Sequence, residues 1–273
     1  MKQSISIIGF GSMGSMISKR IIENSIVDQS DLYIATKTRN KTKDLESQYS
    51  SVNIVDSHTA ASESEMIILC VKPRDFIDLL KDIQPFLTPQ KHLISITASI
   101  PISTIEQYHN GPISLAIPTI TGEIGKGVSL IICNSKTNSG SRNQLIKVFS
   151  SMGTVKEVVP ELLDIMIELT SCTPGFIGAL FSNYVSILNK HIRDKGFDED
   201  VEKIFIETIK GTIDLIESRQ MSFNEIISRV ATKGGITEVG VNLINEKIPA
   251  IFEQIIQDTM TKRKMIRESA DNK

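Results

Sequence analysis

The sequence predicts an α/β N-terminal domain built on a doubly wound parallel sheet, followed by an all-helical C-terminal domain. Three observations support this fold class: strand and helix signals alternate through residues 1–160, a glycine-rich turn directly follows the first strand, and strand signals disappear after Pro160. Alternation of this kind is typical of a mostly parallel sheet with helices on both faces. The length of 273 residues suits two modest domains or one large one, and the change of character at Pro160 leads us to expect two, at 1–160 and 161–273.

The predicted strands are short runs of aliphatic residues, and helical patterns separate most of them. We expect strands at about 5–8, 32–35, 52–54, 66–71, 93–97, 113–117, 128–133 and 155–159. Helices are expected directly after the glycine-rich turn and at about 41–48, 75–83 and 138–151. Ligands of such sheets bind at the carboxyl ends of the strands, which here include residues 9–14, 36–39, 71–73 and 97–99.

The glycine-rich turn reads Gly9-Phe10-Gly11-Ser12-Met13-Gly14 and lies between the first predicted strand and the first helix. Gly9 permits the tight turn out of the strand, Gly11 lets a pyrophosphate approach the backbone, and Gly14 lets the helix pack closely on the sheet. The free N–H groups and the positive dipole end of the helix then face the phosphates. This context predicts a Rossmann-type dinucleotide site; the alternative is a glycine-rich turn that binds no ligand.

The loop after the second strand is basic. It reads Thr36-Lys37-Thr38-Arg39-Asn40-Lys41, and no acidic residue follows until Asp44. A site for NAD(H) usually places Asp or Glu here for the ribose 2′-hydroxyl. A carboxylate would repel a 2′-phosphate, whereas the Arg39 fork can bind one at two points and threonine hydroxyls can donate to it. The loop therefore favours NADP(H) over NAD(H), and the alternative is a solvated basic turn.

The remainder of the chain is predicted to be helical. Residues 162–192 are apolar nearly all round and are interrupted only by Pro174-Gly175. A helix that is hydrophobic on every side must be buried on every side, so we expect a second subunit and at least a homodimer. Charged helices follow at about 199–218, 222–231 and 237–268, and the basic stretch 261–273 is expected to be a solvated helix end.

The composition argues against a nucleic-acid-binding, a metal-binding or a membrane protein. The formal net charge of −2, with both signs interspersed, gives no indication of a nucleic-acid partner. Three cysteines (Cys70, Cys133 and Cys172) fit reduced thiols of a cytoplasmic protein, and four scattered histidines do not indicate a metal site. The longest aliphatic run, 66–71, is too short to span a bilayer, and no signal peptide is recognised. We therefore expect no metal, no membrane association and a cytoplasmic location.

A second chemically suggestive stretch is Thr232-Lys233-Gly234-Gly235-Ile236-Thr237. Two adjacent glycines ahead of a helix, flanked by hydroxyls, form a nest of backbone N–H groups that suits an anion such as a carboxylate. The alternative is an interhelical turn in which Thr237 is the N-cap of the following helix.

The chain resembles the pyrroline-5-carboxylate reductase family along nearly its whole length. The motifs that carry the resemblance are Gly9–Gly14, Val71-Lys72-Pro73, Ser95-Ile96-Thr97-Ala98, Gly125-Lys126-Gly127, Ser171-Cys172-Thr173-Pro174 and Thr232–Thr237. The resemblance implies an N-terminal Rossmann domain, an all-helical dimerisation domain, and reduction of a cyclic imino acid to proline with NAD(P)H.

The resemblance also implies roles for residues that match the family motifs. It assigns the pyrophosphate to Gly9, Phe10, Gly11, Ser12, Met13 and Gly14. It assigns the 2′-phosphate to Thr38 and Arg39, and the nicotinamide ribose region to Val71, Lys72, Pro73 and Ala98. The substrate carboxylate would be bound across the dimer by the backbone of Thr232, Gly234, Gly235 and Ile236. The Thr237 hydroxyl would hydrogen-bond the imine nitrogen, while catalysis would rest on orienting the nicotinamide.

Three departures from the family pattern keep other functions open. The family's Arg-x-Met-Pro-Asn segment is Ala116-Ile117-Pro118-Thr119, its Ser-Gly-Ser-Gly-Pro-Ala is Thr170–Gly175, and the Pro before its Gly-Gly pair is Lys233. This pattern is similar to a late-competence branch of bacterial homologues, so the second hypothesis is a non-catalytic regulator that binds NADP(H). A third, a β-hydroxyacid dehydrogenase, needs a lysine in the linking region, and residues 161–178 contain none.

Overall fold

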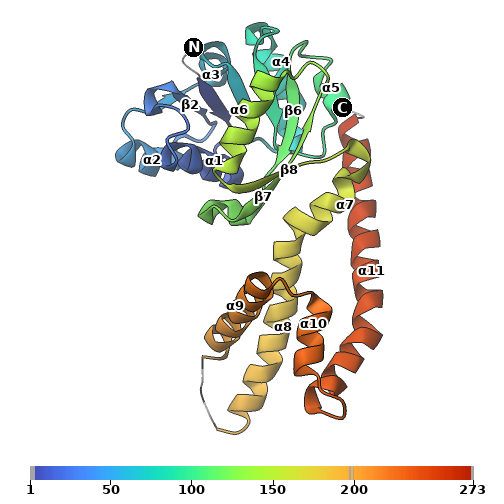
Figure 1. Cartoon of the computed structure of the whole chain (residues 1–273). Coiled ribbons are helices and arrows are strands. Elements are labelled where there is room, and N and C mark those ends of the chain that lie inside the picture. The colour runs from blue at the N-terminus through green and yellow to red at the C-terminus, as the bar shows by residue number, and fades with distance from the viewer. Residues whose placement is uncertain (1–3, 197, 199, 272–273) are drawn as a thin grey trace. The chain divides into compact units, whose positions relative to one another are not determined.

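The computed structural model describes residues 4–196, 198 and 200–271, with the Arg39 side chain and those beyond residue 268 outside the description. The chain forms two compact units (Figure 1). The N-terminal unit comprises Met1–Pro174 together with Lys262–Lys273, and the helical unit comprises Gly175–Thr261. The sequence-based division at 160 differs from these units in two segments, 161–174 and 262–273, which both lie with the N-terminal unit.

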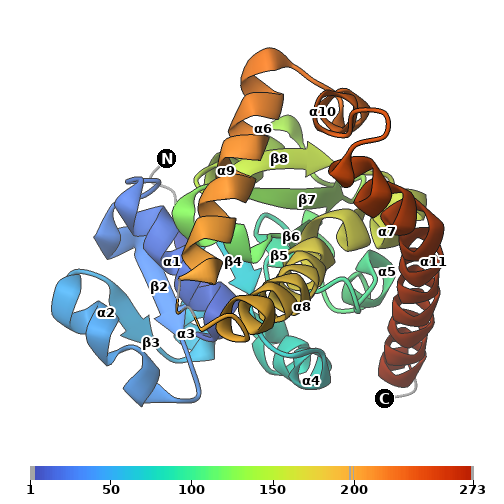
Figure 2. The same ribbon diagram turned by 90° about the horizontal axis from the view of Figure 1, so that it is seen from below.

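The N-terminal unit is built on an eight-stranded sheet with the order β3-β2-β1-β4-β5-β6-β7-β8. Neighbouring strands are parallel except β6 and β7, which pair antiparallel. The strands are β1 Ile5–Ile8, β2 Leu32–Ala35, β3 Asn53–Val55, β4 Met66–Leu69, β5 His92–Ser95, β6 Ile113–Ile117, β7 Gly127–Cys133 and β8 Gly153–Glu157. The mostly parallel, doubly wound sheet is confirmed (Figure 2).

Helices cover both faces of this sheet because its strands are apolar on both sides. In β1, Ile5 and Ile7 belong to the core on one face, whereas Ile8 belongs to the core on the other. The first face is covered by α1 (Ser12–Glu23), α2 (Lys43–Gln48) and α6 (Ser139–Ser150). The second face is covered by α3 (Ser57–Glu63), α4 (Pro73–Ile83), α5 (Ile102–Ile105) and α7 (Leu163–Ile167).

Helix α3 was not expected from the sequence, because only Ala60 and Ala61 carry its buried face. Side chains stabilise both of its ends. Asp56 caps the N-terminus by accepting from the Thr59 N–H at 2.8 Å. At the other end, the Lys91 ammonium donates to three backbone carbonyls, each at 2.7 Å, where a cation also complements the helix dipole. The Asp56 cap is local, but Lys91 lies 27–30 residues away from the carbonyls that it binds, so the local pattern does not reveal this contact.

The expected interruption at Pro174-Gly175 is wrong, because α8 runs without a break from Thr173 to Arg193. Pro174 lies in its first turn, where the missing N–H costs no intrahelical hydrogen bond. The irregularity lies one turn earlier, where Glu168–Cys172 is a π-helix. The Thr173 hydroxyl donates to the Glu168 carbonyl at 2.9 Å and bridges this wide turn.

The helical unit consists of α8, α9 (Val201–Arg219), α10 (Phe223–Val230) and the greater part of α11 (Ile236–Asp271). The predicted helix start at Glu199 lies outside the described residues. Many large apolar side chains here are exposed within the single chain, among them Tyr184, Ile187, Ile236 and Val239. By length and composition, residues 160–193 could also cross a membrane, unlike the run 66–71 considered above.

Candidate functional site

The glycine-rich turn between β1 and α1 depends on the absence of side chains. Gly9 has a φ of +108°, and a Cβ there would lie 2.4 Å from the Cys70 carbonyl oxygen. A Cβ on Gly14 would lie 2.0 Å from the Gly9 carbonyl oxygen, so α1 packs directly on the turn. Apart from the chain adjoining Gly11 itself, no heavy atom of the described residues lies within 4 Å of the Cβ position of Gly11. The turn is therefore closed beneath Gly9 and Gly14 and open above Gly11, where a ligand can approach the backbone.

The turn opens into a cavity of about 720 Å³ at the carboxyl ends of the first parallel strands. Among the predicted cofactor-binding residues, the cavity is lined by Gly9, Phe10, Gly11, Thr38, Val71 and Lys72. The predicted residues Ser12, Met13 and Gly14 lie in the first turn of α1, and Pro73 is the first residue of α4. Ala98 lies in the loop after β5.

The loop after β2 brings cations to the same cavity. Thr36, Lys37, Thr38 and Lys41 all line it, and the Thr38 N–H donates to the Thr36 hydroxyl at 3.2 Å. Arg39 begins a short 3₁₀ turn, and its side chain lies outside the described part of the structure. Lys41 was not among the predicted phosphate-binding residues, although its place three residues after Thr38 is visible in the sequence.

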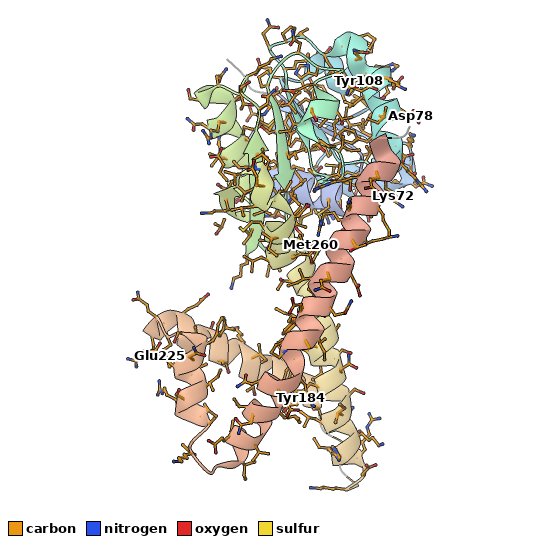
Figure 3. The ribbon with its side chains drawn as sticks, turned by 90° about the vertical axis from the view of Figure 1, so that its right-hand side faces the viewer. Lys72, Asp78, Tyr108, Tyr184, Glu225 and Met260 are labelled. Atoms are coloured by element: carbon orange, nitrogen blue, oxygen red, sulfur yellow. The ribbon has the colours of Figure 1, made fainter. Side chains whose placement is uncertain are left out.

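The cavity also has an acidic side that sequence reasoning missed. Asp75, Asp78 and Asp82 of α4 line it, because a spacing of three or four residues keeps side chains on one helix face. Lys72 and Asp78 lie on the same side of the N-terminal unit (Figure 3). Asp82 accepts a hydrogen bond from Ser57 at 3.2 Å and pairs with His58 at 2.8 Å. The hydrogen bond from His58 lowers the pKa of Asp82.

The turn before α11 forms the second candidate site. Gly234 has a φ of +77°, and the Gly235 N–H donates to the Thr232 carbonyl at 2.8 Å. The Gly234 N–H donates at 2.7 Å to a carboxylate oxygen of Glu238, in the first turn of the helix. Because α11 begins at Ile236, Thr237 lies inside the first turn rather than at the N-cap, which removes that alternative. In this structure the Gly234 N–H is thus already occupied by a carboxylate of the same chain, that of Glu238.

The departures from the family motifs have visible structural roles. Thr119 is buried, and its hydroxyl accepts from the Val128 N–H at 2.9 Å. Leu115, which stands at the Arg position of the five-residue motif, is buried in β6. Ser171 and Cys172 lie in the π-helix, and the Ser171 hydroxyl is buried without a hydrogen-bond partner among the described residues. Lys233 is exposed, as expected for a side chain that points to solvent.

No metal centre accompanies these sites in the part of the chain that the structure describes. There, no three His, Cys, Asp or Glu side chains are placed to hold a metal ion. The cavity at the glycine-rich turn belongs to the N-terminal unit, whereas the Gly234-Gly235 turn belongs to the helical unit.

Comparison with known families divides the chain in a similar way. Residues 4–99 match the family described as NADP oxidoreductase coenzyme F420-dependent. Residues 160–266 match the pyrroline-5-carboxylate reductase dimerisation family.

Known proteins match the chain over nearly its full length. Pyrroline-5-carboxylate reductase 3 of Bacillus subtilis is 30% identical over 270 residues, which cover 97% of each chain. ComE operon protein 4 of the same organism is 26% identical over 259 residues, which cover 94% of each. The crystal structure of Plasmodium falciparum pyrroline carboxylate reductase with NADP bound superposes with a TM-score of 0.81, at 20% identity and with 99% and 98% of the two chains covered. The resemblance read from the motifs is confirmed: the chain belongs to the pyrroline-5-carboxylate reductase family.

Proposed function

We propose that this protein reduces 1-pyrroline-5-carboxylate to L-proline with NADPH. The observation that carries the proposal is one cavity in which the open glycine turn and the basic loop after β2 lie together. A dinucleotide with an additional phosphate suits this combination, because the helix N-terminus favours the pyrophosphate and lysines favour the 2′-phosphate. The similarity to a reductase of Bacillus subtilis and to a structure with NADP bound supports the same assignment.

The cofactor-binding residues follow from this arrangement. Gly9 to Gly14 would bind the pyrophosphate, and Thr38, Arg39 and Lys41 the 2′-phosphate. Val71, Lys72, Pro73 and Ala98 would line the nicotinamide ribose region, because they follow β4 and β5 on the side of β1 opposite to β2. When bound, NADPH supplies a hydride from its nicotinamide ring.

The substrate would be held by the turn before α11. The backbone of Thr232, Gly234, Gly235 and Ile236 would bind the carboxylate, as the Gly234 N–H already does with Glu238. The imine nitrogen carries a proton as the hydride reaches the ring carbon, so the C=N double bond becomes a C–N single bond and the nitrogen becomes an amine. The Thr237 hydroxyl would hydrogen-bond this nitrogen, and NADPH leaves as NADP⁺.

We further propose that a second copy of the chain covers the exposed apolar side chains of the helical unit, giving at least a homodimer. The match to a dimerisation family over residues 160–266 supports this assembly. In this assignment residues 1–160 bind the cofactor, residues 161–273 provide dimerisation and substrate contacts, and the enzyme is cytoplasmic.

The test is oxidation of NADPH at 340 nm by purified protein, with and without pyrroline-5-carboxylate, beside Thr237→Ala. Turnover that depends on the imino acid and falls in Thr237→Ala is the expected result. Absence of turnover in wild-type protein, together with NADPH binding, would contradict the reductase assignment.

A second candidate is a non-catalytic regulator that binds NADP(H). The specific observation in its favour is that buried Leu115 and Thr119 stand where the family motif has Arg and Asn. The similarity to ComE operon protein 4 over 94% of the chain supports it as well. Binding of NADPH without turnover is the result that this candidate predicts.

A further inference from the structure

One face of the last turns of α11 packs on the N-terminal unit, while most of residues 261–268 are exposed. Residues from Lys262 onward belong to that unit, although the helix begins in the other. Arg263 and Arg267 lie four residues apart and therefore on one face of the helix. Opposite them, Asp164 and Glu168 are also four residues apart, in α7 and at the start of the π-helix. The expectation of a solvated helix end does not anticipate this contact, because the partners lie about 100 residues away.

The four side chains form a compact, charge-balanced cluster. The two guanidinium nitrogens of Arg267 donate to the two carboxylate oxygens of Asp164 at 2.9 and 2.5 Å. Arg263 pairs with Glu168, whose side chain is only 5% exposed, and lies 3.7 Å from Asp164. A buried ion pair contributes little net stability, yet removing one partner leaves the other charge buried alone. The cluster therefore serves to fix position more than to stabilise the fold.

Arg267 makes one further contact that links this cluster to the proposed cofactor site. One of its guanidinium nitrogens lies 3.4 Å from the backbone carbonyl oxygen of Ala98. Ala98 lies in the loop at the carboxyl end of β5, at the sheet edge where ligands of such folds bind. Strand β5 follows β4 in the sheet, on the side away from the basic loop after β2. The loop that contains Ala98 is thus placed for the nicotinamide half of the dinucleotide.

We propose that Arg267 is a positioning residue, which holds the Ala98 loop against Asp164 and so orients the nicotinamide for hydride transfer. The proposal rests on the proposed reductase function. Arg267 contacts the Asp164 carboxylate and the Ala98 carbonyl, so it would act on the cofactor through the backbone of Ala98. Its planar fork binds the carboxylate at two points while one nitrogen also reaches the carbonyl, which the point charge of a lysine cannot reproduce.

The test compares Arg267→Ala and Arg267→Lys with wild-type protein, and Lys264→Ala, on the exposed side of the same turn, is the matched control. A small misplacement of the reacting groups is costly, so we expect Arg267→Ala to lower kcat by about tenfold or more. The Kd for NADPH and the KM for the imino acid should change much less. The deuterium isotope effect on kcat with [4-²H]NADPH should rise, because hydride transfer becomes slower relative to the other steps. Arg267→Lys should recover part of kcat, and Lys264→Ala should match wild type.

An unchanged kcat and isotope effect in Arg267→Ala would overturn the proposal, even if its Tm falls. If Arg267→Ala does not fold, the test rests on Arg267→Lys: a kcat below wild type with a larger isotope effect would support the proposal, and wild-type values would overturn it. If wild-type protein does not reduce pyrroline-5-carboxylate, the proposed function fails. The positioning role of Arg267 is then tested on bound NADPH alone. A shorter nicotinamide fluorescence lifetime in the Arg267 variant than in wild type would then support the proposal, and equal lifetimes would overturn it.

Discussion

The two units of this chain differ in where they bury their apolar residues. In the N-terminal unit, strands such as β4 are fully buried between helices of the same chain. In the helical unit, α8 has no buried residue, and Ile236 at the start of α11 is 94% exposed. An exposed apolar surface of this extent marks an interaction site in a soluble protein. The cavity at the glycine-rich turn is thus lined by residues of one chain, whereas the unit that carries the proposed substrate turn leaves its apolar surface uncovered in the single chain.

The largest effect should come from breaking the packing of the N-terminal unit at Gly14. In Gly14→Ala the new Cβ would collide with the Gly9 carbonyl, and overpacking against backbone costs about 3 kcal/mol of unfolding free energy. Urea unfolding should show this loss, together with loss of NADPH binding. Gly11→Ala is the control, because its Cβ meets open space: it should keep the wild-type stability and weaken NADPH binding only. Equal stability of the two variants would contradict this account of the turn.

The N-terminal unit should also lose stability in acid, because burial lowers the pKa of His92 to about 4. Burial likewise lowers the pKa of His109. In the unfolded chain His92 takes up a proton near pH 6.5, whereas in the fold it stays neutral until about pH 4. The stability is therefore complete above pH 6.5 and falls by up to about 3 kcal/mol as the pH falls to 4.

His92→Gln, which can keep a hydrogen bond to the Ser114 hydroxyl, should flatten this pH profile. His191→Gln, on the exposed surface of α8, should leave it unchanged. Urea unfolding between pH 4 and 8 makes the comparison, and a wild-type slope in His92→Gln would refute the assignment.

A charge on the exposed face of the helical unit should separate the subunits. Ile187 is 58% exposed in the single chain, and Ile187→Asp would bury a carboxylate in the proposed interface. We expect the dissociation constant of the oligomer to rise by about 100-fold, while NADPH binding by the N-terminal unit persists. Light scattering during gel filtration measures the mass, with Lys81→Asp on the exposed surface of α4 as the control. An unchanged mass over a wide concentration range would place the interface elsewhere.

The smallest effect concerns the substrate turn itself. In Glu238→Gln the side chain loses the charge that competes for the Gly234 N–H, so the KM for pyrroline-5-carboxylate should fall by about threefold. The KM for NADPH should not change, and Glu246→Gln, further along α11, should behave as wild type. A higher KM in Glu238→Gln would show that Glu238 assists substrate binding instead of competing with it.

Sequence reasoning succeeds here where the signal is local. The glycine turn, the basic loop and the strands of the mostly parallel sheet all follow from residues that are neighbours in the chain. It fails where a partner is distant: α3 depends on Lys91, the acidic side of the cavity depends on the placement of α4, and Arg267 meets Asp164 across about 100 residues. The break expected at Pro174 failed for another reason, since proline is tolerated in a first helical turn.

The return of α11 to the N-terminal unit has a consequence for synthesis of the chain. Chains emerge from the ribosome with the N-terminus first, so the sheet can form long before residue 263 is made. Until then Asp164 and Glu168 lack their arginines, and a truncated chain would keep two acids at the packed surface of α7 without a counter-charge. A full-length chain therefore neutralises Asp164 and Glu168 with Arg267 and Arg263, whereas a chain truncated before residue 263 would not.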